Sequence, residues 1–441
     1  MKNRKLFALM ALITASLVVN LGFTSVSPVF PHLILALKGL LKELPELVLG
    51  VIPAHRGAIE FGILMAAFMA TRAPIAVIAG ALSDVVGRRK LVVFGMAIYL
   101  VVSLGFYLSN DFMFFTLFRA LQGVASAMVW PAAEAYIADL TTVESRGKAI
   151  SAYVATMSIA EVIGPAIGVV IYKWYITVFG PYDVIAALKS PFAFLVVSSA
   201  FSLILLSTLP KVQFSKVERR IIRGFQEIRR RLSNLPKAIA LSIKALYING
   251  SVNGISMGIM STVVIAYIIE EVTKDPANLG ILFLASGAVG IPVTLFAGYV
   301  SDKMGSRKPL ILLGYLIARP MAFIIPLIKD FLLLLFLTML FSLAFSLSMP
   351  LMRALQADLI ESDVRGTVFG FQQLFFNSGV IIGALLGSFL CAYFAPHKYM
   401  LFGLQVSGYI VPFWIVGFLG IITTIIFILY VVDIKQRGEQ R

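Results

Sequence analysis

Two ionisable side chains lie deep inside apolar runs that are long enough to cross a membrane. Arg119 falls within the run 112–138, and Glu161 falls near the middle of the run 149–172. A charge in hydrocarbon is costly, so each must face a partner or a water-filled cavity. We expect the two to be partners, with Glu161 binding a proton when it is apart from Arg119 and losing it on approach. A permanently ionised structural pair is the alternative.

A second group of charges lies in a loop that occurs twice. The stretch 80–90 (GALSDVVGRRK) returns as 298–308 (GYVSDKMGSRK), and its aspartates differ by 302 − 84 = 218 positions. A carboxylate there can accept hydrogen bonds from a helix N-terminus, and the loop arginines can pair with acidic residues of other inner loops, Asp139, Glu144, Asp358 or Asp363. We expect a conformational clamp; charges that only fix topology are the alternative. The expected clamp comprises Gly80, Asp84, Gly87, Arg88, Arg89, Asp139, Arg146, Gly298, Asp302, Gly305, Arg307, Asp358 and Arg365.

The elements that position these residues are membrane helices. The chain has 441 residues, of which 59% are hydrophobic and 13% charged, and its mean hydropathy is +0.94. So much apolar surface cannot be buried in one water-soluble core, and helices satisfy their own backbone hydrogen bonds in lipid. Twelve spans of about 20 residues or more are expected. They cover 6–30, 58–82, 91–108, 112–138, 149–172, 192–209, 239–268, 279–300, 310–328, 331–357, 368–394 and 410–431.

The positions of the basic residues indicate topology. The net charge is +15, and Lys and Arg gather at the N-terminus, in the duplicated loops, in 211–237 and in the C-terminal tail. This asymmetry places both termini in the cytoplasm and argues against a nucleic-acid partner. The basic segment 211–237 is either an amphipathic helix on the inner membrane surface or a solvated linker.

The two halves of the chain match beyond the repeated loop. Pro131, Asp139, Arg146 and Gly164 recur 219 positions later, for example 350 − 131 = 219. The sequence therefore predicts an all-α membrane protein of two pseudo-symmetric six-helix bundles, 1–210 and 238–441, joined by 211–237.

One pair of equivalent residues has opposite charges. Glu134 and Arg353 are related by the same repeat, since 353 − 134 = 219, and equivalent residues near a pseudo-two-fold axis face each other. We expect an inter-bundle gate at the inner end of a cavity, with Glu134 as a further candidate for proton coupling. Local pairing of Arg353 with Asp358 or Glu361 is the alternative.

Three motifs resemble those of the major facilitator superfamily. The loop 80–90 resembles that family's signature between helices two and three, 119–123 (RALQG) its helix-four motif, and 164–168 (GPAIG) a helix-five motif of the drug/proton antiporter branch. The resemblance implies two bundles that rock around a midplane binding site. By the same resemblance, the cavity is lined by Asn20, Phe23, Arg72, Gln122, Tyr247, Asn249, Asn253, Gln372, Phe376 and Asn377. Arg319, in the usually peripheral helix nine, is expected to support structure.

Other functional classes lack support in the sequence. There is no Walker-type phosphate loop, no His, Cys and carboxylate grouping with metal-ligand spacing, and a single cysteine, Cys391. We therefore expect no cofactor, no metal and no enzyme activity. The expected function is proton-coupled export of organic compounds by a monomeric, multi-pass protein of the cell membrane. A proton-coupled importer of sugars or other metabolites and a non-transporting membrane sensor are the alternatives.

Overall fold

The computed structural model describes residues 2–141, 143–210, 236–359, 362–401 and 403–433. Within these residues, twelve helices are long and apolar enough to cross a membrane. The all-α fold with twelve spans that the sequence predicts is therefore confirmed. The chain divides into two compact units, 1–217 with Ile268–Leu284 (unit 1) and 218–267 with 285–441 (unit 2).

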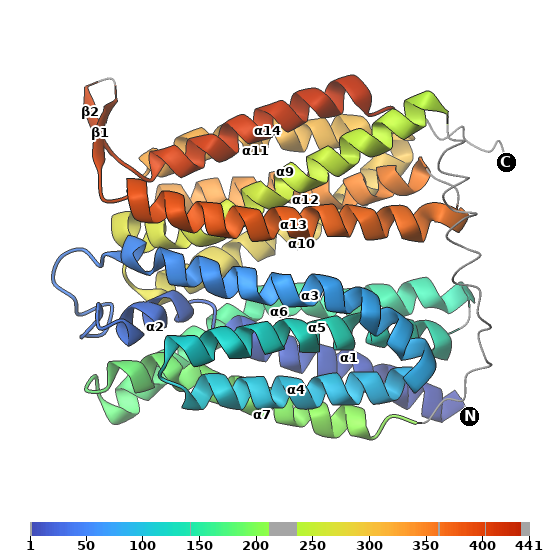
Figure 1. Cartoon of the computed structure of the whole chain (residues 1–441), viewed down its shortest axis with the longest axis horizontal. Helices are drawn as coiled ribbons and strands as arrows, with labels where there is room; N and C mark the ends of the chain where they lie inside the picture. Colours follow the sequence, from blue (N-terminus) through green and yellow to red (C-terminus); the bar gives the residue numbers. More distant parts are fainter. Residues whose placement is uncertain (1, 142, 211–235, 360–361, 402, 434–441) are drawn as a thin grey trace. The chain divides into compact units, whose positions relative to one another are not determined.

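Unit 1 contains six spanning helices and one short helix, α2 (Figure 1). A 3-10 turn, η1 (Ala54–Gly57), precedes the second spanning helix. A π-helix, η2, and the start of α10 also belong to this unit. The elements are α1 (Lys2–Ser25), α2 (Phe30–Leu37), α3 (Ala58–Val86), α4 (Arg88–Leu108), α5 (Phe112–Leu140), α6 (Val143–Phe179), α7 (Val184–Ser207) and η2 (Ile268–Val272).

Unit 2 contains the other six spanning helices and a hairpin that projects from one end of the unit (Figure 1). The hairpin strands are antiparallel, and Lys398 pairs with Ser407. The elements are α9 (Lys237–Tyr267), α10 (Pro276–Met304), α11 (Lys308–Ile324), η3 (Ile325–Leu327), α12 (Phe331–Asp358), α13 (Ser362–Phe394), β1 (Lys398–Leu401), β2 (Leu404–Ser407) and α14 (Ile410–Tyr430).

The two units share much of one pattern of helix packing, although α3 packs closely against α5 in unit 1 and the equivalent helices α10 and α12 of unit 2 do not pack as closely. In unit 1, α1 packs against α6 and α7, and α4 packs against α5 and α7. In unit 2, the equivalent helix α9 packs against α13 and α14, and α11 packs against α12 and α14. The internal repeat of the sequence is thus also a repeat of structure.

Small residues let α6 approach α1 closely, and let the equivalent helix α13 approach α9 closely. A Cβ atom on Gly168 would overlap the backbone of Ser25 in α1, and one on Gly383 would overlap the backbone of Ile255 in α9. Without a hydrophobic driving force between helices in lipid, such close backbone packing is a main source of association. These glycines of α6 and α13 therefore have a packing role within their own units.

Several helices continue further than the apolar runs indicate, among them α6 and α7 and, at the repeated loops, α3 and α10. The sequence places Asp84 and Asp302 after the second and eighth spans, whereas α3 extends to Val86 and α10 to Met304. Hydropathy marks the part of a helix that lies in hydrocarbon, and a helix can continue into the headgroup region. Each helix ends at a glycine with positive φ, Gly87 at 100° and Gly305 at 62°, a conformation that costs other residues energy.

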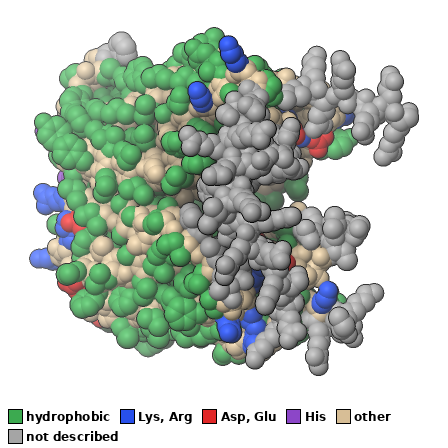
Figure 2. Space-filling view, turned by 45° about the vertical axis from the view of Figure 1, so that its right-hand side comes forward, with side chains coloured by type: hydrophobic (Ala, Val, Ile, Leu, Met, Phe, Trp, Pro, Cys, Tyr) green, Lys and Arg blue, Asp and Glu red, His purple; other side chains and the backbone are tan. Residues whose placement is uncertain are grey.

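Large apolar side chains cover much of the outer surface of the helices. Figure 2 shows them across the face in view, and Phe94, Phe296 and Leu316 are each at least 60% exposed. A surface of this kind is stable in lipid and not in water. The chain is a multi-pass membrane protein.

Candidate functional site

In unit 1, the first repeated loop is held by its arginines. The Nη1 atom of Arg88, at the start of α4, contacts both the carboxylate of Asp139 and the carbonyl oxygen of Ala135 at the end of α5. Arg89 donates from Nη2 to the carbonyl oxygen of Ser207, at the end of α7, at 2.6 Å. The loop therefore connects the ends of α4, α5 and α7.

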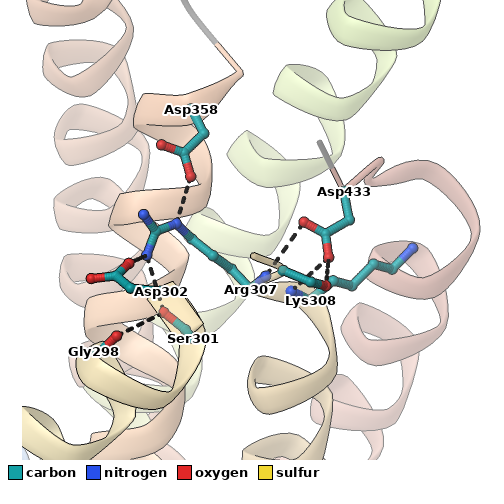
Figure 3. Close-up of polar contacts among 8 residues, drawn as sticks. Gly298, Ser301, Asp302, Arg307, Lys308, Asp358 and Asp433 are labelled. Carbon is teal, nitrogen blue, oxygen red and sulfur yellow. Dashed lines mark hydrogen bonds and ion pairs between the residues drawn. The ribbon is translucent and has the colours of Figure 1, made fainter. Parts of the chain in front are cut away.

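In unit 2, the repeated loop uses its arginine as a fork (Figure 3). Arg307 donates from Nε to Asp358 Oδ2 at 2.5 Å and from Nη1 to Asp302 Oδ1 at 3.2 Å. Its Nη1 also lies 3.1 Å from the hydroxyl oxygen of Ser301. A planar guanidinium can satisfy several acceptors at once, and here it joins α10 to the end of α12.

Asp433 is a part of this cluster that sequence reasoning missed. Its carboxylate accepts from the Ser306 hydroxyl at 2.5 Å, from the Lys308 backbone N–H at 3.1 Å and from the Arg307 backbone N–H at 3.5 Å (Figure 3). These backbone groups begin α11, where the helix dipole favours negative charge. The signal in the sequence was an isolated carboxylate directly after the last apolar run.

Several predicted clamp residues are not part of the described structure. Gly80 and the side chains of Asp84, Arg146 and Arg365 lie outside the described residues, as do those of Glu144, Glu361 and Asp363. The linker helix expected over 211–237 falls mainly in 211–235, which also lies outside the described residues.

Arg119 is enclosed by neutral partners. It donates from Nη1 to Gln122 Oε1 at 2.6 Å and from Nη2 to the Met65 sulfur at 3.5 Å. Its guanidinium also lies 5.8 Å from the ring centre of Phe30 and 5.1 Å from that of Phe68. Gln122 and these rings stabilise the cation without a carboxylate.

Arg72 faces the same aromatic ring as Arg119. Its guanidinium carbon lies 5.7 Å from the ring centre of Phe68 in α3. Thr71 of α3 also donates to the carbonyl oxygen of Ala120 in α5 at 2.7 Å. The predicted residues Arg72, Arg119 and Gln122 are therefore brought together between α3 and α5.

Glu161 lies apart from this group. Its side chain is exposed on α6, and in the part of the chain that the structure describes no hydrogen bond or ion pair joins it to Arg119. The expected partnership rested on similar depth along the membrane normal. Depth fixes one coordinate of three, and the rotation of each helix about its axis decides which side chains meet.

Asn20 and Phe23 of α1 have local partners in unit 1. Asn20 donates to the carbonyl oxygen of Ser16 at 2.8 Å. The Phe23 ring lies 4.8 Å from the ring of Tyr99, which in turn lies 6.0 Å from Trp130. Phe23 thus begins an aromatic row that includes two residues the sequence did not single out.

In unit 2, two predicted cavity residues belong to a polar network with Arg319. Asn249 is only 2% exposed, and it accepts from Asn253 at 2.5 Å and from the Tyr315 hydroxyl at 3.2 Å. Arg319 donates to Asn253 at 3.0 Å and covers the Tyr315 ring at 4.5 Å. The network joins α9 to α11, which agrees with the supporting role expected of Arg319.

The remaining predicted residues of unit 2 lie on α9 and α13. Tyr247 stacks on Phe375 with ring centres 5.2 Å apart. Gln372 fills the space beside Gly250, and Asn377 accepts from Gln373 at 2.8 Å. Phe376 is half-buried. Phe375, which the sequence analysis did not name, is thus the aromatic partner of Tyr247.

The expected gate residues belong to different units. Glu134 of α5 and Arg353 of α12 both have exposed side chains. Because one lies in each unit, their pairing stays a prediction. Among the described residues there is also no group of three or more His, Cys, Asp or Glu side chains arranged to hold a metal ion.

Comparison with known proteins gives one consistent result. The family model of the Major Facilitator Superfamily matches residues 12–243 and 246–441. The chain is 27% identical over 353 residues to Multidrug resistance protein 2 of Bacillus subtilis, covering 78% of this chain and 84% of that protein. It is 25% identical over 328 residues to a protein of Lactococcus lactis named multi-drug resistance efflux pump PmrA homolog, covering 72% and 75%.

A solved structure shares the fold. A D-xylose-proton symporter matches with a TM-score of 0.68 at 14% sequence identity, over 96% of this chain and 98% of that chain. The twelve helices, the repeated packing and the family match over nearly the whole length agree. The chain belongs to the major facilitator superfamily and is a membrane transporter.

Proposed function

We propose that this transporter exports organic compounds by alternating access, in exchange for protons. Two relatives named for multidrug resistance, each matched over more than 70% of this chain, support export. The basic loop ends at Arg88 and Arg307 support an orientation with both termini in the cytoplasm. We also propose that the protein acts as a monomer in the cell membrane.

The observation that carries proton coupling is the position of Glu161. A carboxylate in the middle of α6 is exposed on that helix, and no hydrogen bond or ion pair engages it within the described residues. In a membrane, an ionised group without a fixed partner requires water or a proton. Glu161 is therefore available to exchange protons as its surroundings change.

Arg119 has a different role in this proposal. Gln122, Met65 and two aromatic rings hold its guanidinium on the α3–α5 side of unit 1. A cation with fixed neutral partners contributes a constant positive potential. In this proposal Arg119 supplies that potential and Glu161 exchanges the proton. Glu134 is a second candidate carboxylate for proton exchange.

The arginine–aspartate pairs fit the role of a conformational clamp. Arg88 with Asp139, and Arg307 with Asp358, each join the start of one helix to the end of the next within a unit. These side chains are only partly exposed, so water weakens the pairs without abolishing them. Such contacts are strong enough to favour one arrangement and weak enough to be exchanged during a cycle.

Aromatic side chains on both units suit a large, partly apolar compound. Phe23 and Trp130 flank Tyr99 in unit 1, and Tyr247 contacts Phe371 and Phe375 in unit 2. Aromatic faces bind apolar rings and organic cations. An organic cation is accordingly the first compound to test.

Transport by the purified protein in liposomes tests this function. With an acidic interior, an antiporter accumulates ethidium as protons leave, beyond the level in protein-free liposomes. We expect Glu161→Gln to abolish gradient-driven accumulation. Asp183→Asn, which alters the N-cap carboxylate of α7, is the matched control and retains transport. Ethidium accumulation that ignores the pH gradient would contradict proton coupling.

The same liposomes separate the alternatives. A sugar symporter would accumulate labelled D-xylose when the outside is acidic. A sensor would bind a compound without moving it in either gradient.

A further inference from the structure

The segment Ile268–Leu284, which we call the strap, belongs structurally to unit 1. It comprises η2, a short connection and the first turns of α10, and it groups with 1–217. In sequence, however, it continues from Tyr267 of α9 and into Ala285 of α10, both of which belong to unit 2. Any movement of one unit relative to the other is therefore transmitted to the contacts that hold the strap.

Glu270 makes the first attachment, to the turn before α3. Its Oε2 accepts from the backbone N–H of His55 at 3.2 Å, and both of its oxygens lie 3.0 Å from His55 Nδ1. The two side chains are 12% and 15% exposed. One carboxylate thus engages both the backbone and the ring of one residue.

Asp275 makes the second attachment, to α6. Its carboxylate lies 3.3 Å from Lys173 Nζ, and Lys173 also pairs with Glu46 at 2.8 Å. The Tyr172 hydroxyl donates to the other oxygen of Glu46 at 2.9 Å. Because Asp275 also accepts from the Ala277 backbone N–H at 2.8 Å, it fixes the first turn of α10 as well.

The connection between these attachments is also bonded to unit 1. Lys274 donates from Nζ to the carbonyl oxygen of Val48 at 3.0 Å. Further along α10, a Cβ on Gly280 would meet Val169 of α6 at 2.9 Å, so the two helices are in close contact there. Polar contacts therefore hold the strap from η2 to the first turn of α10, and close packing at Gly280 continues to the second turn.

The strap begins with an unusual helical turn. η2 is a five-residue π-helix, and Thr273 N donates to the carbonyl oxygen of Ile268 at 2.7 Å. A π-helix of this kind is rare and is less favourable than an α-helix. The contacts of Glu270 with His55 help to hold this less favourable turn, which makes the turn a suitable point of conformational change.

We propose that the strap is a releasable latch, which Glu270 and Asp275 close on His55 and Lys173 and which must open once in every transport cycle. The inference rests on the alternating-access function proposed above. The Lys173–Asp275 ion pair is 40% and 34% exposed, and an exposed pair of this kind is individually weak, which suits a contact that breaks and re-forms.

A cross-linking experiment tests whether the latch must open. In a Cys391→Ser background, which removes the single native cysteine, His55→Cys and Glu270→Cys are joined by a short reducible bifunctional thiol reagent. The control pair is Lys38→Cys with Glu60→Cys, which replaces an ion pair of 2.5 Å that lies wholly within 1–217.

We expect the cross-link at 55 and 270 to lower ethidium transport at least tenfold and reductant to restore it. The control cross-link leaves transport within about twofold of the reduced protein. Normal transport by protein that is fully cross-linked at 55 and 270 would overturn the latch and leave the proposed function intact.

Hydrogen exchange tests the latch without reference to transport. We expect Lys173→Met to speed amide exchange in peptides from 268–284 at least tenfold, whereas Lys90→Met, an exposed lysine of α4, leaves those peptides unchanged. Unchanged exchange in Lys173→Met would overturn the proposal. If the reduced proteins moved no compound at all, the proposed function would fail, and the exchange result would still decide the latch.

Discussion

The same turn is held by different chemistry in the two units. In unit 1, the turn from α4 to α5 offers the carbonyl oxygens of Tyr107 and Ser109 and the amide oxygen of Asn110, and the Lys189 ammonium of α7 contacts all three. In unit 2, the turn from η3 to α12 offers the carbonyl oxygens of Ile325 and Ile328 to the Tyr267 hydroxyl of α9. The turns are equivalent, since 328 − 109 = 219.

Both turns have carbonyl groups that need a hydrogen-bond donor, but the residue that donates differs between the two units. A helix ends with carbonyl groups that lack intrahelical partners, and each buried one needs a donor. Lys189 is only 6% exposed and Tyr267 only 1%, so both donors are withdrawn from solvent. They come from helices that are not equivalent in the repeat, α7 and α9, so the two units satisfy the same carbonyl groups in different ways.

The largest expected effect comes from removing the charged donor. Lys189→Met keeps the length of the side chain but leaves three oxygens without their ammonium, and we expect a loss of about 3 kcal/mol in the free energy of unfolding. Tyr267→Phe removes neutral hydrogen bonds, for which about 1 kcal/mol is expected. Denaturant unfolding in detergent measures both, and the exposed Lys398→Met is the control. A larger loss in Tyr267→Phe than in Lys189→Met would break the comparison.

Two histidines sharpen the comparison through pH. His32 in unit 1 and His397 in unit 2 each place Nδ1 near the carbonyl oxygen four residues earlier, that of Pro28 or Tyr393. Only His32 is buried, and burial lowers its pKa from 6.5 to about 4, against the opposing effects of the Pro28 and Lys274 backbone and of the Glu46 and Asp275 charges.

The sign of the pH effect follows from this lowered pKa. In the unfolded chain His32 becomes protonated as the pH falls below about 6.5, whereas in the folded protein it becomes protonated only near pH 4. Stability from this residue is therefore complete above pH 6.5 and is lost as the pH falls, by ~2 kcal/mol at pH 5.

Unfolding measured from pH 7 to pH 5 tests this expectation. His32→Gln should lose less stability over that range than the wild type does, by the amount assigned to His32. His397→Gln should match the wild type. Equal pH slopes for the wild type and His32→Gln would show that His32 does not carry the effect.

The smallest effect is expected at the repeated loops. The Asp433 carboxylate accepts from the Lys308 backbone N–H at the start of α11. The N-cap residue of α4, by contrast, is Gly87, which has no side chain to cap the helix. Asp433→Asn weakens this cap, and a loss of about 1 kcal/mol is expected. Amide exchange should become faster at 307–311 and stay unchanged at 88–92. Faster exchange at 88–92 alone would contradict the assignment.

The sequence was sufficient for the architecture because hydropathy and the repeat are both long-range signals. Twelve apolar runs predicted twelve helices, and the offset of 219 predicted equivalent packing in the two units. Helix ends were less accurate, since α3 reaches Val86 and α10 reaches Met304 although their apolar runs end earlier.

The details of the site depend on helix rotation and on distant partners. Arg119 was expected beside Glu161 from depth alone, and its bonded partners are Gln122 and Met65. Asp433 contacts residues more than 120 positions earlier in the chain. Neither relationship has a periodic signal, because it arises only when helices from different parts of a unit pack together.

Proton release on binding tests the central claim, that transport is coupled through Glu161, most directly. Ethidium is added to the purified protein in weakly buffered detergent solution, and a pH indicator records the protons released while fluorescence records binding. We predict release from the wild type and none from Glu161→Gln, which still binds ethidium. Binding without release in the wild type, or equal release from Glu161→Gln, would contradict the account.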